Sequence, residues 1–149
     1  MNSSKEIRKA GNLELEGLTG GIIGCAIAVH KELGPGFLES IYENALLLAL
    51  KQEGIMAEAQ KIIPVFFRGH QVGEQRLDIL VADLVIVELK AVKALDDVHF
   101  AQVRSYLKAA SLKHGLLLNF STATLTIKRV IHESPSCLPA FLSDSPSCL

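Results

Sequence analysis

Hydrophobic residues recur at two different spacings along the chain, and the change of spacing predicts where helices give way to strands. A helical spacing predicts one helix up to residue 33 and a second over about 37–53, separated by Gly34, Pro35 and Gly36. The apolar positions of the first are Leu18, Ile22, Cys25, Ala26, Val29 and Leu33. The apolar positions of the second are Leu38, Ile41, Ala45 and Leu48. We expect Thr19 to cap the first helix and Gly54 to end the second.

Runs rich in β-branched residues follow the helices and predict three strands. Residues 57–67 predict a strand at a sheet edge or one with an irregularity, because Pro64 cannot donate to a strand ladder. Residues 76–91, RLDILVADLVIVELKA, predict a largely buried β-hairpin that turns at Ala82 and Asp83.

The last part of the pattern predicts one more helix and two short strands. The helix covers about 96–110, and the strands cover 115–120 and 124–130. Asp96 or Asp97 is expected to cap the helix. The resulting order of helices and strands predicts an α/β domain with a mixed central sheet.

The central hairpin carries three ionisable residues in strands that are otherwise fit for a core, namely Asp78, Glu88 and Lys90. Leaving such a charge buried and unpaired costs several kcal/mol. Glu88 and Lys90 share one face of their strand because side chains alternate. Asp78 joins that face only if the turn has an odd number of residues, and we predict such a turn, which places Asp78 opposite Glu88 rather than Val87.

Two interpretations of this trio stay open on the residues alone. The two carboxylates could bind a divalent cation through oxygen while the ammonium of Lys90 orients a water or meets a phosphate. Lys90 could instead form a structural ion pair with one acid.

Polar residues on the predicted helices also have two interpretations. Glu39 falls in the first turn of the second helix, where an acid is favourable for structural reasons alone. Gln102 and Tyr106 are four residues apart and therefore face one neighbour, which could be a cation's water shell, a phosphate or the backbone at the edge of the core.

Composition indicates a folded globule. Of 149 residues, 49% are hydrophobic and 21% are charged, which argues against disorder. The net charge is −1, but residues 88–129 hold seven basic residues against three acidic ones. A nucleic-acid partner is therefore neither announced nor excluded.

The cysteine content and the hydropathy predict a soluble, cytoplasmic protein. An odd number of cysteines, three, does not make a disulfide framework, which favours a reducing compartment. The apolar run over 18–29 is too short to cross a bilayer. We expect a flexible arm over 1–16, one domain over 17–132, and a low-complexity tail over 133–149 that repeats SPSCL.

Four motifs in order give the chain a family resemblance. They are Asp78, then Glu88 and Lys90 as E-x-K, then Gln102 and Tyr106 as Q-xxx-Y, all after the helical segment GFLESIY from Gly36 to Tyr42. This combination resembles the PD-(D/E)XK nuclease superfamily, and the helical segment is similar to the signature of its GxxExxY branch. The resemblance covers roughly residues 18–130 and departs from the superfamily name at one place, where Leu77 stands for the proline.

The resemblance implies a restriction-endonuclease-like core and a role for each matching residue. It implies that Asp78, Glu88 and Glu39 hold Mg²⁺ or Mn²⁺, and that Lys90 positions the attacking water. The catalytic set it implies comprises Lys90, Glu88, Asp78 and Gln102. The expected substrate-binding set comprises Tyr106, Tyr42, Arg104 and Lys108.

Two functions follow from the resemblance. The first is metal-dependent hydrolysis of nucleic-acid phosphodiester bonds, with DNA ahead of RNA as substrate. The second is a non-catalytic module on the same fold that binds nucleic acid or protein. A homodimer or a subunit of a larger complex is the expected assembly, with no membrane partner.

Overall fold

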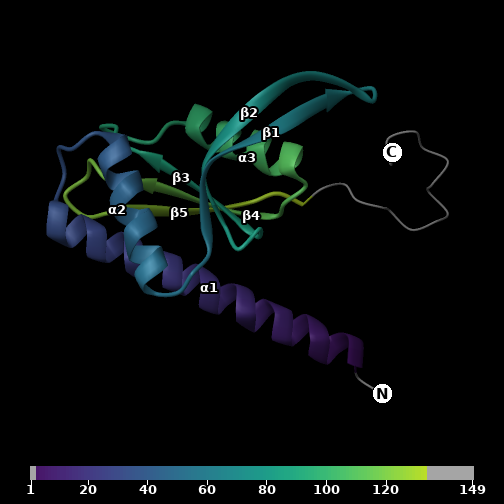
Figure 1. Ribbon diagram of the computed structural model, residues 1–149, viewed down its shortest axis with the longest axis horizontal. Helices are drawn as coiled ribbons and strands as arrows, with labels where there is room; N and C mark the ends of the chain where they lie inside the picture. The colour runs from purple at the N-terminus through teal and green to yellow at the C-terminus, as the bar shows by residue number, and fades with distance from the viewer. Residues whose placement is uncertain (1–2, 134–149) are drawn as a thin grey trace.

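A five-stranded mixed sheet lies between two helices on one face and a third helix on the other (Figure 1). The computed structural model describes residues 3–133 and the side chains of residues 14–133. The helices are α1 (Ser3–Leu33), α2 (Glu39–Gln52) and α3 (Asp97–Ala110). The strands are β1 (Ala57–Phe67), β2 (His70–Val81), β3 (Val85–Lys90), β4 (His114–Asn119) and β5 (Thr126–Ile131). The predicted α/β class with a mixed central sheet is confirmed.

The strands lie in the sheet in their sequence order, β1-β2-β3-β4-β5. All neighbours are antiparallel except β3 and β4, which α3 connects as a parallel pair. Lys90 and Asn119 end these two strands and are register partners. The carboxyl ends of β3 and β4 therefore open at the same edge of the sheet, which is where such sheets place their sites. β1 is an edge strand, as its proline predicted.

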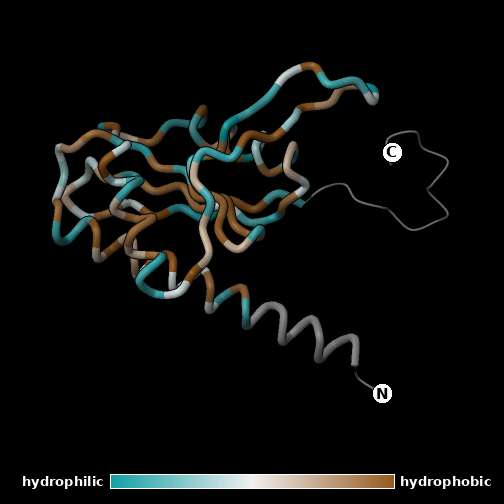
Figure 2. Tube along the Cα trace, viewed as in Figure 1, coloured by the Kyte–Doolittle hydropathy of each residue, from teal (hydrophilic) through white to brown (hydrophobic). Residues whose placement is uncertain are grey.

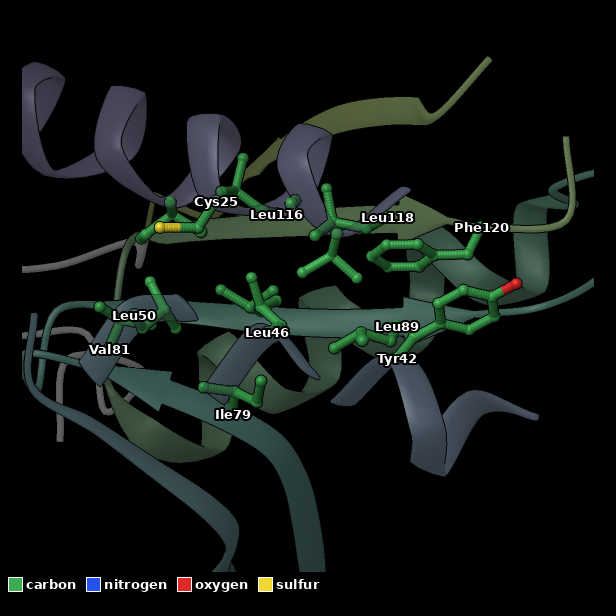
Figure 3. Packing of buried hydrophobic residues seen from close by; sticks show 14 of the residues in the cluster. Cys25, Tyr42, Leu46, Leu50, Ile79, Val81, Leu89, Leu116, Leu118 and Phe120 are labelled. Carbon is green, nitrogen blue, oxygen red and sulfur yellow. The ribbon is translucent and has the colours of Figure 1, made fainter. Parts of the chain in front are cut away.

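Helices α1 and α2 cover one face of the sheet with a continuous apolar core (Figure 3). Tyr42, Leu46 and Leu50 are fully buried along α2. The ring of Tyr42 stacks on Phe120, with ring centroids 4.5 Å apart. On the opposite face α3 packs close to β4, because Gly115 has no side chain to hold the helix away. A Cβ added at Gly115 would lie 2.9 Å from Val103 Cγ1.

Two helix predictions are wrong. The first helix begins at Ser3, so the backbone over 3–16, which was expected as an arm, is helical. Thr19 therefore lies inside the helix, where its hydroxyl donates to the carbonyl of Leu15 at 2.8 Å instead of capping. Among the described residues, none of the helices has the length and apolar character needed to span a bilayer. The predicted tail lies outside the described residues from residue 134 onward.

The buried face of α2 also differs from the predicted one. Leu38 and Leu48 are 72% and 57% exposed, whereas Tyr42, Leu46 and Leu50 are buried. At 100° per residue the two faces lie roughly a third of a turn apart. The correct face carries Glu39, whose side chain reaches the end of β3.

Candidate active site

The β2–β3 hairpin brings Asp78 and Glu88 together, because its connection has three residues. Val81 pairs with Val85 and Ile79 with Val87, so the same register places Asp78 opposite Glu88, as predicted. The backbone pairing of β2 with β3 ends at Ile79. Beyond it, the carboxylate of Asp78 accepts a hydrogen bond from the N–H of Leu89 at 3.0 Å.

Glu88 is a nearly buried carboxylate beside a lysine. It is 4% exposed, and its Oε1 lies 3.4 Å from Nζ of Lys90. Its second oxygen, Oε2, is buried and has no N–H or hydroxyl donor among residues 14–133. The carboxylate of Asp78 is within reach of Glu88, so the two acids can share one proton. A buried acceptor without a donor costs about 1–3 kcal/mol, so this position calls for a ligand or a proton.

The electrostatics of the two acids also indicate that the site needs a cation or a proton. Burial, and then the charge of Asp78, raise the pKa of Glu88 to about 8, although Lys90 opposes the shift. Burial and the charge of Glu39 raise the pKa of Asp78, while its hydrogen bond from Leu89 and the charge of Lys90 lower it. One ammonium does not balance this group of acids, so the site favours either a proton on Glu88 or a bound cation.

Helix α2 adds two further acids from the side of the sheet edge. Oε1 of Glu39 accepts the N–H of Ala91 at 3.2 Å, directly after Lys90. Glu43 lies one turn later and accepts a hydrogen bond from Nε2 of Gln60 at 2.7 Å. Partial burial, and the charges of Asp78 and Glu39, raise the pKa of Glu43. Glu43 is not among the predicted site residues, although its spacing of four from Glu39 on one helix was a usable signal.

Helix α3 contributes the predicted glutamine and tyrosine. Nε2 of Gln102 donates to the hydroxyl of Tyr106 at 2.7 Å. Burial, and then the charges of Glu88 and Asp78, raise the pKa of Tyr106. The pair therefore bonds to itself beside the acids, and not to backbone at the edge of the core.

Asn119 is a second residue near the site that was not predicted from the sequence. It is 1% exposed at the end of β4, and its side chain accepts the N–H of Val92 and donates to the carbonyl of Val92, at 3.1 and 2.8 Å. The N–H of Phe120 bonds the carbonyl of Lys90 at 2.9 Å. These contacts hold the backbone that follows Lys90, and the only signal was an amide in an apolar strand.

The predicted substrate-binding set is not brought together. Tyr42 is fully buried, and its hydroxyl accepts the N–H of Phe37 at 3.1 Å and donates to the carbonyl of Gly34. A substrate cannot reach it, so the prediction of direct contact is wrong. Arg104 and Lys108 are exposed on α3, roughly 200° around the helix from Gln102 and Tyr106. Their role in substrate binding stays a prediction.

The oxygen-rich donors fit a hard divalent cation. Mg²⁺ prefers oxygen ligands and usually needs only one or two carboxylates. Asp78, Glu88 and Glu39 supply carboxylates, and the unpartnered Oε2 of Glu88 is available without breaking a contact. Within residues 14–133, whose side chains the structure describes, no three His, Cys, Asp or Glu side chains form a metal-binding cluster. Asp78 and Glu39 are bonded to backbone amides.

Comparison with known proteins adds a family and a fold. The family model described as PD-(D/E)XK nuclease superfamily matches residues 16–130. A solved structure, "Crystal structure of SSO0001", is similar with a TM-score of 0.52 at 18% identity, and the match covers 64% of this chain. The chain matches 50% of the length of that structure, and the likeness concerns the fold alone. No curated protein sequence matches.

Proposed function

Because the chain belongs to the PD-(D/E)XK nuclease superfamily, we propose that it hydrolyses nucleic-acid phosphodiester bonds with a divalent cation, Mg²⁺ or Mn²⁺. One observation carries the proposal. Glu88 has a buried carboxylate oxygen that lacks an N–H or hydroxyl donor among residues 14–133, and it lies close to Asp78 and Lys90. A structural ion pair would not need the second carboxylate, which raises the pKa of Glu88 and opposes ionisation.

Each residue has a role that its contacts support. Asp78 and Glu88 would hold the cation, and Glu39 would complete the set from α2. A bound Mg²⁺ lowers the pKa of its water and offsets negative charge on the phosphate. The hydroxyl of Tyr106, held by Gln102, donates toward the phosphate or the water shell.

Lys90 is the residue on which turnover depends most. Its side chain is 15% exposed, so the ammonium meets little competing water and its charge acts strongly on a nearby phosphate. It can donate to the attacking water and to Glu88 at once, because an ammonium has three donors.

We further infer membership of the GxxExxY branch, because the other two residues of its signature, Gly36 and Tyr42, help to position Glu39. Gly36 has φ 114, which a residue with a side chain rarely adopts. The hydroxyl of Tyr42 ties down the loop at Gly34 and Phe37. These contacts fix where α2 starts and so where Glu39 points.

Cleavage of labelled DNA and RNA, single- and double-stranded, with Mg²⁺ or Mn²⁺ tests the proposal. Lys90→Ala should lower the cleavage rate about 100-fold or more, whereas Lys51→Ala, an exposed lysine on α2, should leave it unchanged. Absence of cleavage by the wild type with every divalent ion, combined with intact binding, would favour the non-catalytic module. DNA as the preferred substrate, a homodimeric state and a cytoplasmic location stay predictions.

A further inference from the structure

The β1–β2 hairpin continues beyond the sheet as a two-stranded arm (Figure 1). β2 pairs with β3 only from Ile79 onward, whereas its pairing with β1 runs out to His70. We call residues 64–74 the arm. A two-stranded ribbon is marginally stable by itself, so an arm of this length suggests a partner that covers it.

The arm exposes large apolar side chains that no core uses. Phe66, Phe67 and Val72 are 61%, 60% and 62% exposed. Figure 2 shows apolar segments along this hairpin, away from those of the central strands. Single exposed apolar residues are ordinary, but Phe66 and Phe67 are consecutive in the strand and therefore place an exposed ring on each face of the ribbon.

The tip combines these aromatic rings with nitrogen donors. The guanidinium of Arg68 lies over the ring of Phe67, 5.0 Å from its centroid, and His70 is the register partner of Phe67. Glu74, at the base of the arm, is its only acid, and residues 62–73 contain no Asp or Glu. Aromatic faces for bases and a cation for phosphate are the combination by which proteins hold unpaired nucleic acid.

The base of the arm is joined to the candidate active site. Nε2 of Gln75 donates to Oγ of Ser105 at 3.0 Å, and that hydroxyl donates to the carbonyl of Gln102 at 2.6 Å. Asp78 follows three residues after Gln75 on the same strand. From His70 to Asp78 the strand spans at most about 26 Å.

We propose that the arm binds unpaired bases of the nucleic-acid strand whose phosphate enters the site at Asp78, Glu88 and Lys90. The inference rests on the proposed function and names its substrate class, a strand with a single-stranded segment beside the reacting bond. A second copy of the chain is a weaker occupant, because a symmetric contact between tips would bring two Arg68 side chains together.

Binding without turnover tests the arm separately from catalysis. Fluorescence anisotropy would follow a labelled single strand of about 12 nucleotides, and the same strand as a duplex, on the Lys90→Ala background with Mg²⁺. Adding Phe66→Ala and Phe67→Ala should weaken single-strand binding at least about 10-fold, with less effect on the duplex. Leu48→Ala, a 57% exposed residue on α2, is the matched control and should change nothing.

Arg68→Ala supplies a second variant at an exposed turn. It should reduce the slope of log affinity against log salt by about 0.7, as expected for one lost phosphate contact to a single strand. Single-strand affinity unchanged in both variants, or no binding by the parent, overturns the proposal. A parent dimer in sedimentation that the phenylalanine variant converts to monomer, with binding unchanged, assigns the arm to a second copy instead. Cleavage without arm dependence would leave the proposed function standing.

Discussion

Replacing Glu88 by glutamine isolates the cost of the buried carboxylate. Glutamine keeps the shape but does not ionise. Glu88 has a pKa raised from 4.5 to about 8 in the folded protein, mainly by burial. Between these values the folded state binds more protons than the unfolded state. The free energy of unfolding of the wild type therefore falls as pH rises through this window, and its stabilisation is complete only below it.

The size of the effect follows from the pKa interval. Each pKa unit corresponds to about 1.4 kcal/mol, so three and a half units correspond to about 5 kcal/mol. This is an upper bound, because water penetration and local relaxation reduce the cost of ionising a buried carboxylate. Between about pH 5 and 9, we expect the free energy of unfolding of the wild type to fall by up to about 5 kcal/mol more than that of Glu88→Gln.

Urea unfolding followed by circular dichroism over this pH range measures the difference. Glu53→Gln, at an exposed site after α2, is the control and should track the wild type. Mg²⁺ at about 100 times its Kd should add about 2.7 kcal/mol to the wild type at alkaline pH and little to Glu88→Gln. Parallel pH profiles for the wild type and Glu88→Gln would refute the reasoning, because they would mean that Glu88 titrates normally.

Three further variants test the surroundings of the site. Asn119→Ala should cost about 2 kcal/mol in urea unfolding, because the partly buried N–H and C=O of Val92 lose their side-chain partner, and it should lower kcat more than it raises KM. Tyr42→Phe should cost about 1 kcal/mol of stability and leave KM unchanged, since its hydroxyl bonds only backbone; a raised KM would restore it as a substrate contact. Gly36→Ala should cost about 1–3 kcal/mol, because φ 114 is strained for alanine, and weaken Mg²⁺ binding through Glu39, as calorimetry would show.

The sequence by itself determined the order of the elements and the hairpin that carries the acids. Alternation of side chains is a local rule, so Glu88 and Lys90 on one face followed from their spacing, and an odd-numbered turn placed Asp78 opposite Glu88. The cap at Asp96 was also predictable, because capping depends on residues within one turn of the chain.

Tertiary packing alone decided which face of α2 is buried and what surrounds Lys90. Leu48 is as apolar as Leu46, and only contact with the sheet selects one for the core. The bonds of Asn119 to Val92 and of Glu43 to Gln60 join residues 27 and 17 positions apart. Such contacts depend on how α2, α3 and the strands pack in three dimensions, which hydrophobic spacing within a single element does not specify.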